Sequence, residues 1–140
     1  MTYDPHSKSG TSRQEILDLL AGLAPPELAE SFDSGRIGLI IEGKEHITKI
    51  STCLDVTLAV VRKAIENRSD LLIAHHTPIW APLTSIGGDD ARLFSMILQS
   101  EMNVYVMHTN WDHAPGGVND ILADLLGLTE RENMSLGLVG

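Results

Sequence analysis

From residue 47 onward, short apolar runs alternate with segments of helical periodicity. Three apolar runs bounded by turn residues are typical of buried strands: 47–54, 71–74 and 104–107. Three amphipathic segments follow them in turn: 57–67, 91–100 and 118–126. Such alternation favours parallel strands joined by helical crossovers. We therefore expect an α/β fold, a mixed sheet with parallel βαβ crossovers and flanking helices.

The chain before residue 47 holds a further helix and a further strand. Ser12 and Glu15 have the spacing of a capping box, and apolar side chains recur at helical intervals over 16–23. The apolar run 37–41 is typical of a strand. Because only a short polar loop separates it from 47–54, we expect these two runs to form an antiparallel hairpin.

A length of 140 residues corresponds to one domain and is enough to bury a core. Hydrophobic residues make up 43% of the chain and aromatic residues only 4%, so the core must be aliphatic. Residues 1–11 are polar, and we expect them to form a loose N-terminal tail that includes His6. Residues 12–140 then form a single α/β domain.

The net charge of −9 disfavours nucleic acids and anionic membranes as partners, because the surface repels phosphate groups at long range. No apolar run approaches the length needed to span a bilayer, and the N-terminus lacks a signal-peptide pattern. The single cysteine, Cys53, cannot form an internal disulfide, and its apolar setting predicts a buried, inert thiol. We expect a soluble, cytoplasmic protein.

Polar side chains follow each of the three predicted parallel strands. Asp55 comes after the first strand, His75 and His76 come after the second, and His108 and Asp112 come after the third. In open α/β sheets, ligands bind outside the carboxyl ends of the parallel strands. Residues more than thirty positions apart are thereby expected to converge on one edge of the sheet.

A metal site accounts best for His75, His76 and Asp112. Two adjacent histidines in extended chain point in divergent directions, so one metal ion could hardly bind both, whereas two neighbouring ions could take one imidazole each. Asp112 supplies the anionic oxygen that offsets the positive charge. Imidazole and carboxylate ligands suit Zn, Mn, Fe, Co or Ni. The alternative is that these histidines are hydrogen-bonded structural groups at the strand ends.

Other residues near these strand ends could assist such a site. His108 could be a ligand, a group that orients a ligand or a proton shuttle, and we prefer the orienting role. Asp55 could also orient a ligand or transfer a proton. His113 could act as a general base, although an exposed loop histidine is an equal alternative.

Two glycines and two tryptophans nearby each have a ligand-binding interpretation and a structural one. Gly116 and Gly117, at a helix start, offer amides that could hold a phosphate, and a helix-entry turn is the alternative. Trp80 and Trp111 could stack on a base, with ordinary packing as the alternative.

The segment 71–76 with Pro78, and above all the thirteen residues 108–120, closely resemble the Nif-three-like proteins. Members of this family are often labelled GTP cyclohydrolase 1 type 2 homologues. The resemblance runs from about Arg13 to Leu128 and covers the N-terminal half of the family pattern. Three positions depart from that pattern: Phe32, Ser34 and Thr77.

The resemblance implies a two-metal site, an α/β fold of two intertwined repeats and ring-shaped hexamers. It places His75 and His76 on different metals and has Asp112 share the metal of His76. The family completes the site with a His and a bridging Glu from a C-terminal half. No histidine follows His113 in this sequence. It therefore carries three of the five expected ligands: either the chain is a truncated product, or the other two ligands come from elsewhere.

Two functions follow from these expectations. The first is a metal-dependent hydrolase that acts on a nucleotide-like substrate and assembles as a homo-oligomer. The second is a non-catalytic, metal-binding scaffold or interaction protein.

Overall fold

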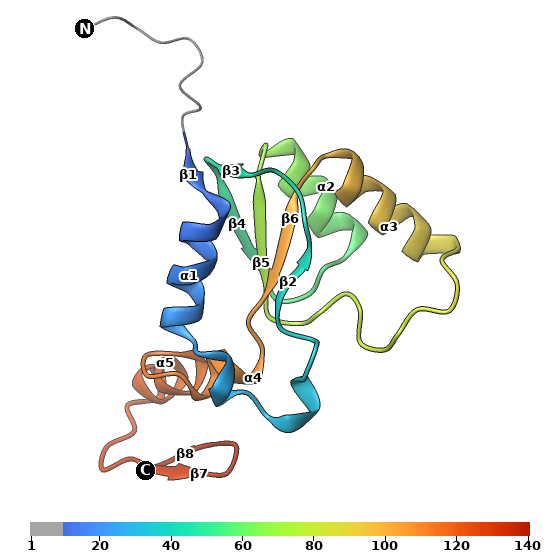
Figure 1. Ribbon diagram of the computed structural model, residues 1–140. Coiled ribbons are helices and arrows are strands. Elements are labelled where there is room, and N and C mark those ends of the chain that lie inside the picture. The colour runs from blue at the N-terminus through green and yellow to red at the C-terminus, as the bar shows by residue number, and fades with distance from the viewer. Residues whose placement is uncertain (1–9) are drawn as a thin grey trace, which may run out of the picture.

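The computed structural model describes residues 10–140, which build a four-stranded sheet with helices on both faces (Figure 1). The strand order is β2-β6-β5-β4. These strands have the following bounds: β2 Gly38–Ile41, β4 Ile50–Cys53, β5 Leu71–Ala74 and β6 Asn103–Val106. Most of the predicted tail, with His6, lies outside the described residues, and the first described strand, β1 (Thr11–Ser12), includes the last residue of that tail.

The sheet is mixed, as the sequence predicts. β4, β5 and β6 are parallel neighbours, and β2 runs antiparallel to β6 at one edge. α2 (Leu58–Glu66) connects β4 to β5, and α3 (Gly88–Gln99) connects β5 to β6. The carboxyl ends of β4, β5 and β6 therefore lie together at one end of the strands, which we call the carboxyl edge of the sheet. Because β2 is antiparallel, the segment that precedes it reaches the same carboxyl edge.

The predicted hairpin between 37–41 and 47–54 is wrong. β2 and β4 lie at opposite edges of the sheet, and the second run divides into β4 and a short β3 (His46–Ile47) that pairs with β1. The connection crosses the end of the sheet and is held by polar side chains from later strands. The Asp70 carboxylate accepts hydrogen bonds from the backbone of Thr48 and Lys49, and the Asn103 side chain accepts one from the Gly43 amide.

The N-terminal helix α1 (Arg13–Leu23) has the predicted capping box between Ser12 and Glu15. Two short 3-10 turns follow it, η1 (Pro26–Leu28) and η2 (Ser31–Asp33). After β6 the chain forms a five-residue helix that the sequence analysis missed, α4 (Thr109–His113). Three elements complete the chain: α5 Val118–Leu126, β7 Glu132–Met134 and β8 Gly137–Val139.

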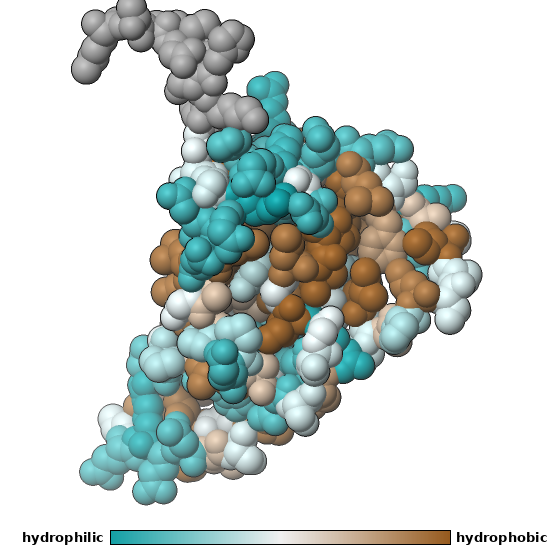
Figure 2. Space-filling view, in the orientation of Figure 1, coloured by the Kyte–Doolittle hydropathy of each residue, from teal (hydrophilic) through white to brown (hydrophobic). Residues whose placement is uncertain are grey.

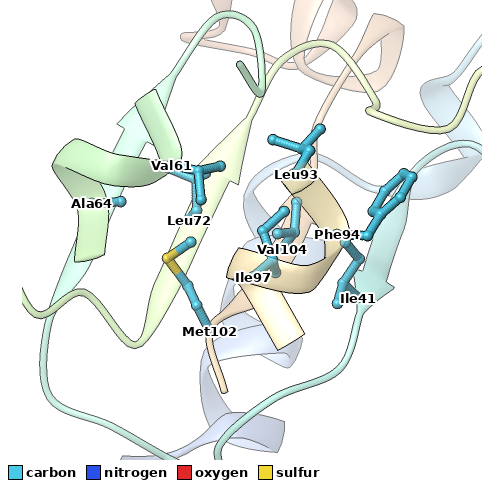
Figure 3. Packing of buried hydrophobic residues seen from close by; sticks show 9 residues of the cluster. All are labelled: Ile41, Val61, Ala64, Leu72, Leu93, Phe94, Ile97, Met102 and Val104. Atoms are coloured by element: carbon cyan, nitrogen blue, oxygen red, sulfur yellow. The ribbon is translucent and has the colours of Figure 1, made fainter. Parts of the chain in front are cut away.

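Apolar side chains cover both faces of the sheet. On one face, α2 and α3 pack against β5 and β6 through an apolar cluster that includes Val61, Leu72 and Ile97 (Figure 3). On the other face, α1 contributes Leu20 and Ala24 to a second cluster. An apolar band crosses the middle of the molecule at the height of the sheet (Figure 2). The core is mainly aliphatic, as expected, but each cluster also holds one buried aromatic residue, Phe94 or Tyr105.

The last helix, α5, leaves most of its apolar face exposed. Ala123 is its one buried residue. Four larger apolar side chains are between 47% and 78% exposed: Ile121, Leu122, Leu125 and Leu126. Among residues 10–140, no helix combines the length and the apolar character needed to cross a membrane.

Candidate metal centre

Three histidines meet at the carboxyl edge of the sheet. His75 and His76 follow β5, and His108 follows β6 by two residues. One ring nitrogen from each can be chosen so that all three lie within 4.8 Å of one another. The ring centroid of His75 lies 5.0 Å from that of His76 and 5.0 Å from that of His108. We call these residues the histidine cluster.

The two adjacent histidines do not diverge as the sequence analysis expected. That expectation assumed extended backbone, but β5 ends at Ala74 and the chain bends at His75 and His76. The bend turns both rings toward the same space. Imidazoles that alternate sides in a strand can therefore converge just beyond its end.

Each ring of the histidine cluster is held through its Nδ1 atom. The Nδ1–H of His75 donates to the backbone carbonyl of Met107 at 2.9 Å. The Nδ1–H of His76 donates to the Asp55 carboxylate at 2.7 Å, and that of His108 donates to Asp33 at 2.9 Å. Carbonyl and carboxylate oxygens only accept, so the proton must lie on Nδ1. In the neutral form of each ring, Nε2 then carries the free lone pair, which is the arrangement of metal-binding histidines.

Asp33 holds His108 in place and is fully buried. It also accepts hydrogen bonds from the backbone amide of Thr109, at 3.1 Å, and from the Thr109 hydroxyl. Burial works to raise the pKa of Asp33, but the side-chain hydrogen bonds from Thr109 and His108 outweigh it and lower that pKa. An ionised Asp33 stabilises the His108 tautomer whose Nε2 is free.

Asp33 was missed by sequence reasoning, which looked for site residues only after the parallel strands. The available signal was its place just before 37–41, but the strand was assigned to the wrong partner. Once β2 is known to run antiparallel to β6, the residues that precede it must lie near the end of β6 and hence near His108.

Asp112 adds a carboxylate beside the histidine cluster. It lies in α4, and its Oδ1 is 3.5 Å from Nε2 of His75. Burial lowers the pKa of His75; the nearby Asp112 opposes this shift and His108 adds to it. The balance favours neutral imidazole, which is the form that binds metal ions.

The structure separates the assisting residues by position. Asp55 lies behind His76, in the orienting place that the sequence analysis allowed. His108, for which an orienting role was preferred, lies within the cluster itself, and Asp33 orients it. His113 points elsewhere, with its Nε2 3.0 Å from the Glu30 carboxylate.

The two glycines before α5 do not offer free amides to a phosphate. The Gly116 amide donates to the Asp120 carboxylate at 2.6 Å, and the Gly117 amide donates to the carbonyl of Ala114 at 2.8 Å. Gly116 has a φ of +72°, and a Cβ on Gly117 would lie 1.9 Å from the carbonyl oxygen of Trp111. The helix-entry turn explains both glycines, and the adjacent carboxylate would repel an anion.

Cys53 is free, as predicted, although it is only half-buried. Burial raises the pKa of its thiol to about 11, and the Asp55 charge adds to the shift. It lines an apolar cavity with His75, Trp111 and residues of α1. The thiol therefore stays protonated and makes a poor metal ligand.

Together, the fold and the cluster define an α/β protein with a histidine-lined edge to its parallel strands. The sequence model of the family Duf34/NIF3 (NGG1p interacting factor 3) matches residues 11–138. The chain belongs to this family, as its resemblance to Nif-three-like proteins predicted.

Relatives and solved structures agree with this assignment. The chain is 38% identical over 121 residues to a GTP cyclohydrolase 1 type 2 homolog of Halalkalibacterium halodurans, which covers 85% of this chain and 32% of that protein. Reduced HcgD from Methanocaldococcus jannaschii has a TM-score of 0.83 at 28% identity, over 91% of this chain and 52% of that one. A Bacillus cereus protein related to NIF3 has a TM-score of 0.82 at 35% identity, over 87% of this chain and 34% of that one. The chain thus spans about a third to a half of these proteins.

Proposed function

We propose that this chain binds divalent metal ions through His75, His76 and His108, with Asp112 as an anionic ligand beside them. The observation that carries the proposal is the set of three converging imidazoles, each held through Nδ1 so that Nε2 is free. A purely structural histidine has no need of a free, inward-facing lone pair. Imidazole and carboxylate donors suit Zn, Mn, Fe, Co or Ni.

The proposal includes two ions, as the family resemblance implies. The described residues offer four donors at this edge, three imidazoles and one carboxylate. Two ions of ordinary coordination number require more donors than these four. Positions would therefore remain for water, for a substrate, or for ligands from a further segment or subunit.

We further propose that the centre hydrolyses a nucleotide-like substrate. When bound, the ions would supply a water molecule of lowered pKa and polarise the bond under attack. The residues of this chain would keep the centre in order: Asp33 and Asp55 fix two imidazole rings, and Met107 fixes the third. The name of the relatives, GTP cyclohydrolase 1 type 2 homolog, makes GTP the first compound to test.

The test is turnover by metal-depleted and metal-reloaded protein. We expect reloading with Mn²⁺ or Zn²⁺ to restore product release from GTP, measured by chromatography, and His76→Ala to abolish it. His113→Asn is the matched control, because His113 lies outside the histidine cluster. Equal turnover with and without metal, or full turnover by His76→Ala, would overturn the hydrolase proposal.

A metal-binding scaffold is the second candidate function. The observation that favours it is the small number of metal donors. Among residues 10–140, Asp112 is the single carboxylate that lies beside an Nε2 atom of the histidine cluster, whereas Asp55 and Asp33 contact Nδ1 atoms. Tight metal binding without turnover of any nucleotide would support the scaffold and exclude the hydrolase.

A further inference from the structure

Two large aromatic side chains stand exposed beside the histidine cluster. Phe32 is 48% exposed and Trp80 is 51% exposed. The Trp80 ring lies 5.8 Å from the ring of His108 at an interplanar angle of 84°, and the Phe32 ring lies 6.4 Å from it. The two aromatic rings are 6.4 Å apart. Residues from η2 and from the loop after β5 thus form one aromatic wall at His108.

The other tryptophan, Trp111, is less exposed than Trp80. Trp111 is only partly exposed and packs against the second core cluster with Leu20 and Tyr105. Packing therefore accounts for Trp111. It does not account for Trp80, which lies outside both core clusters of the described residues.

Arg36 adds a positive charge to the aromatic wall. Its guanidinium carbon lies 4.8 Å from the centre of the Trp80 ring. The guanidinium donates hydrogen bonds to the backbone carbonyls of Trp80, at 2.6 Å, and of Phe32. These acceptors are neutral, and within residues 10–140 no ion pair includes Arg36. The two carbonyls fix the guanidinium without neutralising its charge.

The side of Asp112 away from the histidine cluster is lined by negative rather than positive charge. A cavity of about 370 Å³ lies there, and its polar lining includes Asp112, Asp120, Asn119 and Asn133. An anionic group is unfavourable beside two carboxylates, and the net charge of −9 repels anions generally. Of these two sides of the histidine cluster, the Arg36 side is therefore the one that favours an anion.

We propose that Trp80, Phe32 and Arg36 form a subsite for a planar heteroaromatic ring that carries an anionic group, such as a nucleobase with its phosphate. Aromatic side chains bind such rings by stacking whatever the base, and a guanidinium binds phosphate. The subsite would hold the ligand beside the metal centre. The inference rests on the proposed function, because it names the substrate class that the centre would meet.

The test uses tryptophan fluorescence and calorimetry on the whole chain. Trp111→Phe leaves Trp80 as the only tryptophan, since the chain has two. We expect guanosine 5′-monophosphate to quench Trp80, guanosine to bind more weakly, and ribose 5-phosphate to compete poorly. By calorimetry on the otherwise wild-type chain, Trp80→Leu should weaken nucleotide binding about 5- to 150-fold. Arg36→Gln should reduce the preference for the nucleotide over guanosine.

Metal binding by the same variants separates this inference from the proposed function. We expect Trp80→Leu and Arg36→Gln to bind Mn²⁺ as the wild type does. Nucleotide binding that is unchanged in Trp80→Leu, or equal competition by ribose 5-phosphate, would overturn the subsite even if metal binds. A fall in Trp80 fluorescence that arises only from association of the protein chains with one another, and not from nucleotide binding, would also overturn it. Ring binding without metal binding would keep the subsite and reject the metal centre.

Discussion

Asp33 links the fold to the histidine cluster at the scale of a single residue. It is fully buried and accepts three kinds of hydrogen bond: from an imidazole, a hydroxyl and a backbone amide. Asp33→Asn would place an amide N–H against these donors. We expect a loss of about 1–3 kcal/mol in the free energy of unfolding. Metal affinity should fall about 10- to 100-fold, because His108 loses its orienting carboxylate.

Asp55→Asn is the matched control for the effect of Asp33→Asn on stability. Asp55 also accepts from a cluster imidazole, but it is exposed and makes no comparable network. Urea unfolding and metal titration of both variants provide the measurement. A similar loss of stability in the two variants would contradict the role assigned to burial at Asp33.

Asp70 makes stability depend on pH at the opposite end of the sheet. Burial works to raise its pKa, but hydrogen bonds from Lys44 and Thr48 outweigh it and hold the pKa at about 2. Because the folded pKa lies below the ordinary value of 3.8, the contribution is complete above about pH 4. It is lost as pH falls toward 2, and its size is about 2 kcal/mol.

Asp70→Asn should remove that dependence. We expect the wild type to lose more stability than the variant between about pH 4 and pH 2. Urea unfolding across that range provides the measurement. Parallel loss of stability in both proteins would show that Asp70 is not the group responsible.

At this scale, the sequence located the histidines, Asp112 and one supporting carboxylate, Asp55, but not the support of His108. His75, His76 and His108 could be predicted because they directly follow apolar runs, and parallel strands end at one edge. Asp33 and Arg36 could not, because their contacts depend on which strand pairs with β6. The preferred role of His108 also depended on where its Nδ1 partner lay.

Gly117 decides how α5 begins, which is a property of an element. A Cβ there would lie 1.9 Å from the Trp111 carbonyl oxygen, so the turn between α4 and α5 would have to open. We expect Gly117→Ala to destabilise the protein by about 1–3 kcal/mol. It should also reduce metal affinity, since Asp112 lies in α4.

Gly22→Ala is the control within a helix. A Cβ at Gly22 meets nothing within 4 Å, and alanine favours helix over glycine. We therefore expect Gly22→Ala to raise the melting temperature while Gly117→Ala lowers it. Equal effects of the two substitutions would contradict the close approach at Gly117.

Elements were predicted well where local signals define them. The cap of α1, the crossover helices and the three parallel strands follow from periodicity and capping residues. The hairpin failed because Asp70 and Asn103, distant in sequence, hold the connection between β2 and β4. The short helix α4 lacks the length at which periodicity is visible.

At the scale of the whole molecule, we propose that the chain assembles as a homo-oligomer, and the exposed apolar face of α5 supports this. The family resemblance implies a hexamer. Leu125 is 78% exposed, which is unfavourable unless another surface covers it. We expect light scattering to show assemblies that Leu125→Gln shifts toward smaller species. Leu98→Gln, at a 58% exposed position on α3, is the control. A monomeric wild type, or the same shift in both variants, would contradict a role for α5 in assembly.

The central claim, that the histidine cluster binds divalent metal, is tested most directly by calorimetric titration of Zn²⁺ or Mn²⁺ into metal-depleted protein. We expect the wild type and His113→Asn to bind alike, and His75→Asn, His76→Asn and His108→Asn each to lose at least about tenfold in affinity. Equal binding by all five proteins, or no binding by the wild type, would contradict a metal centre at these strand ends.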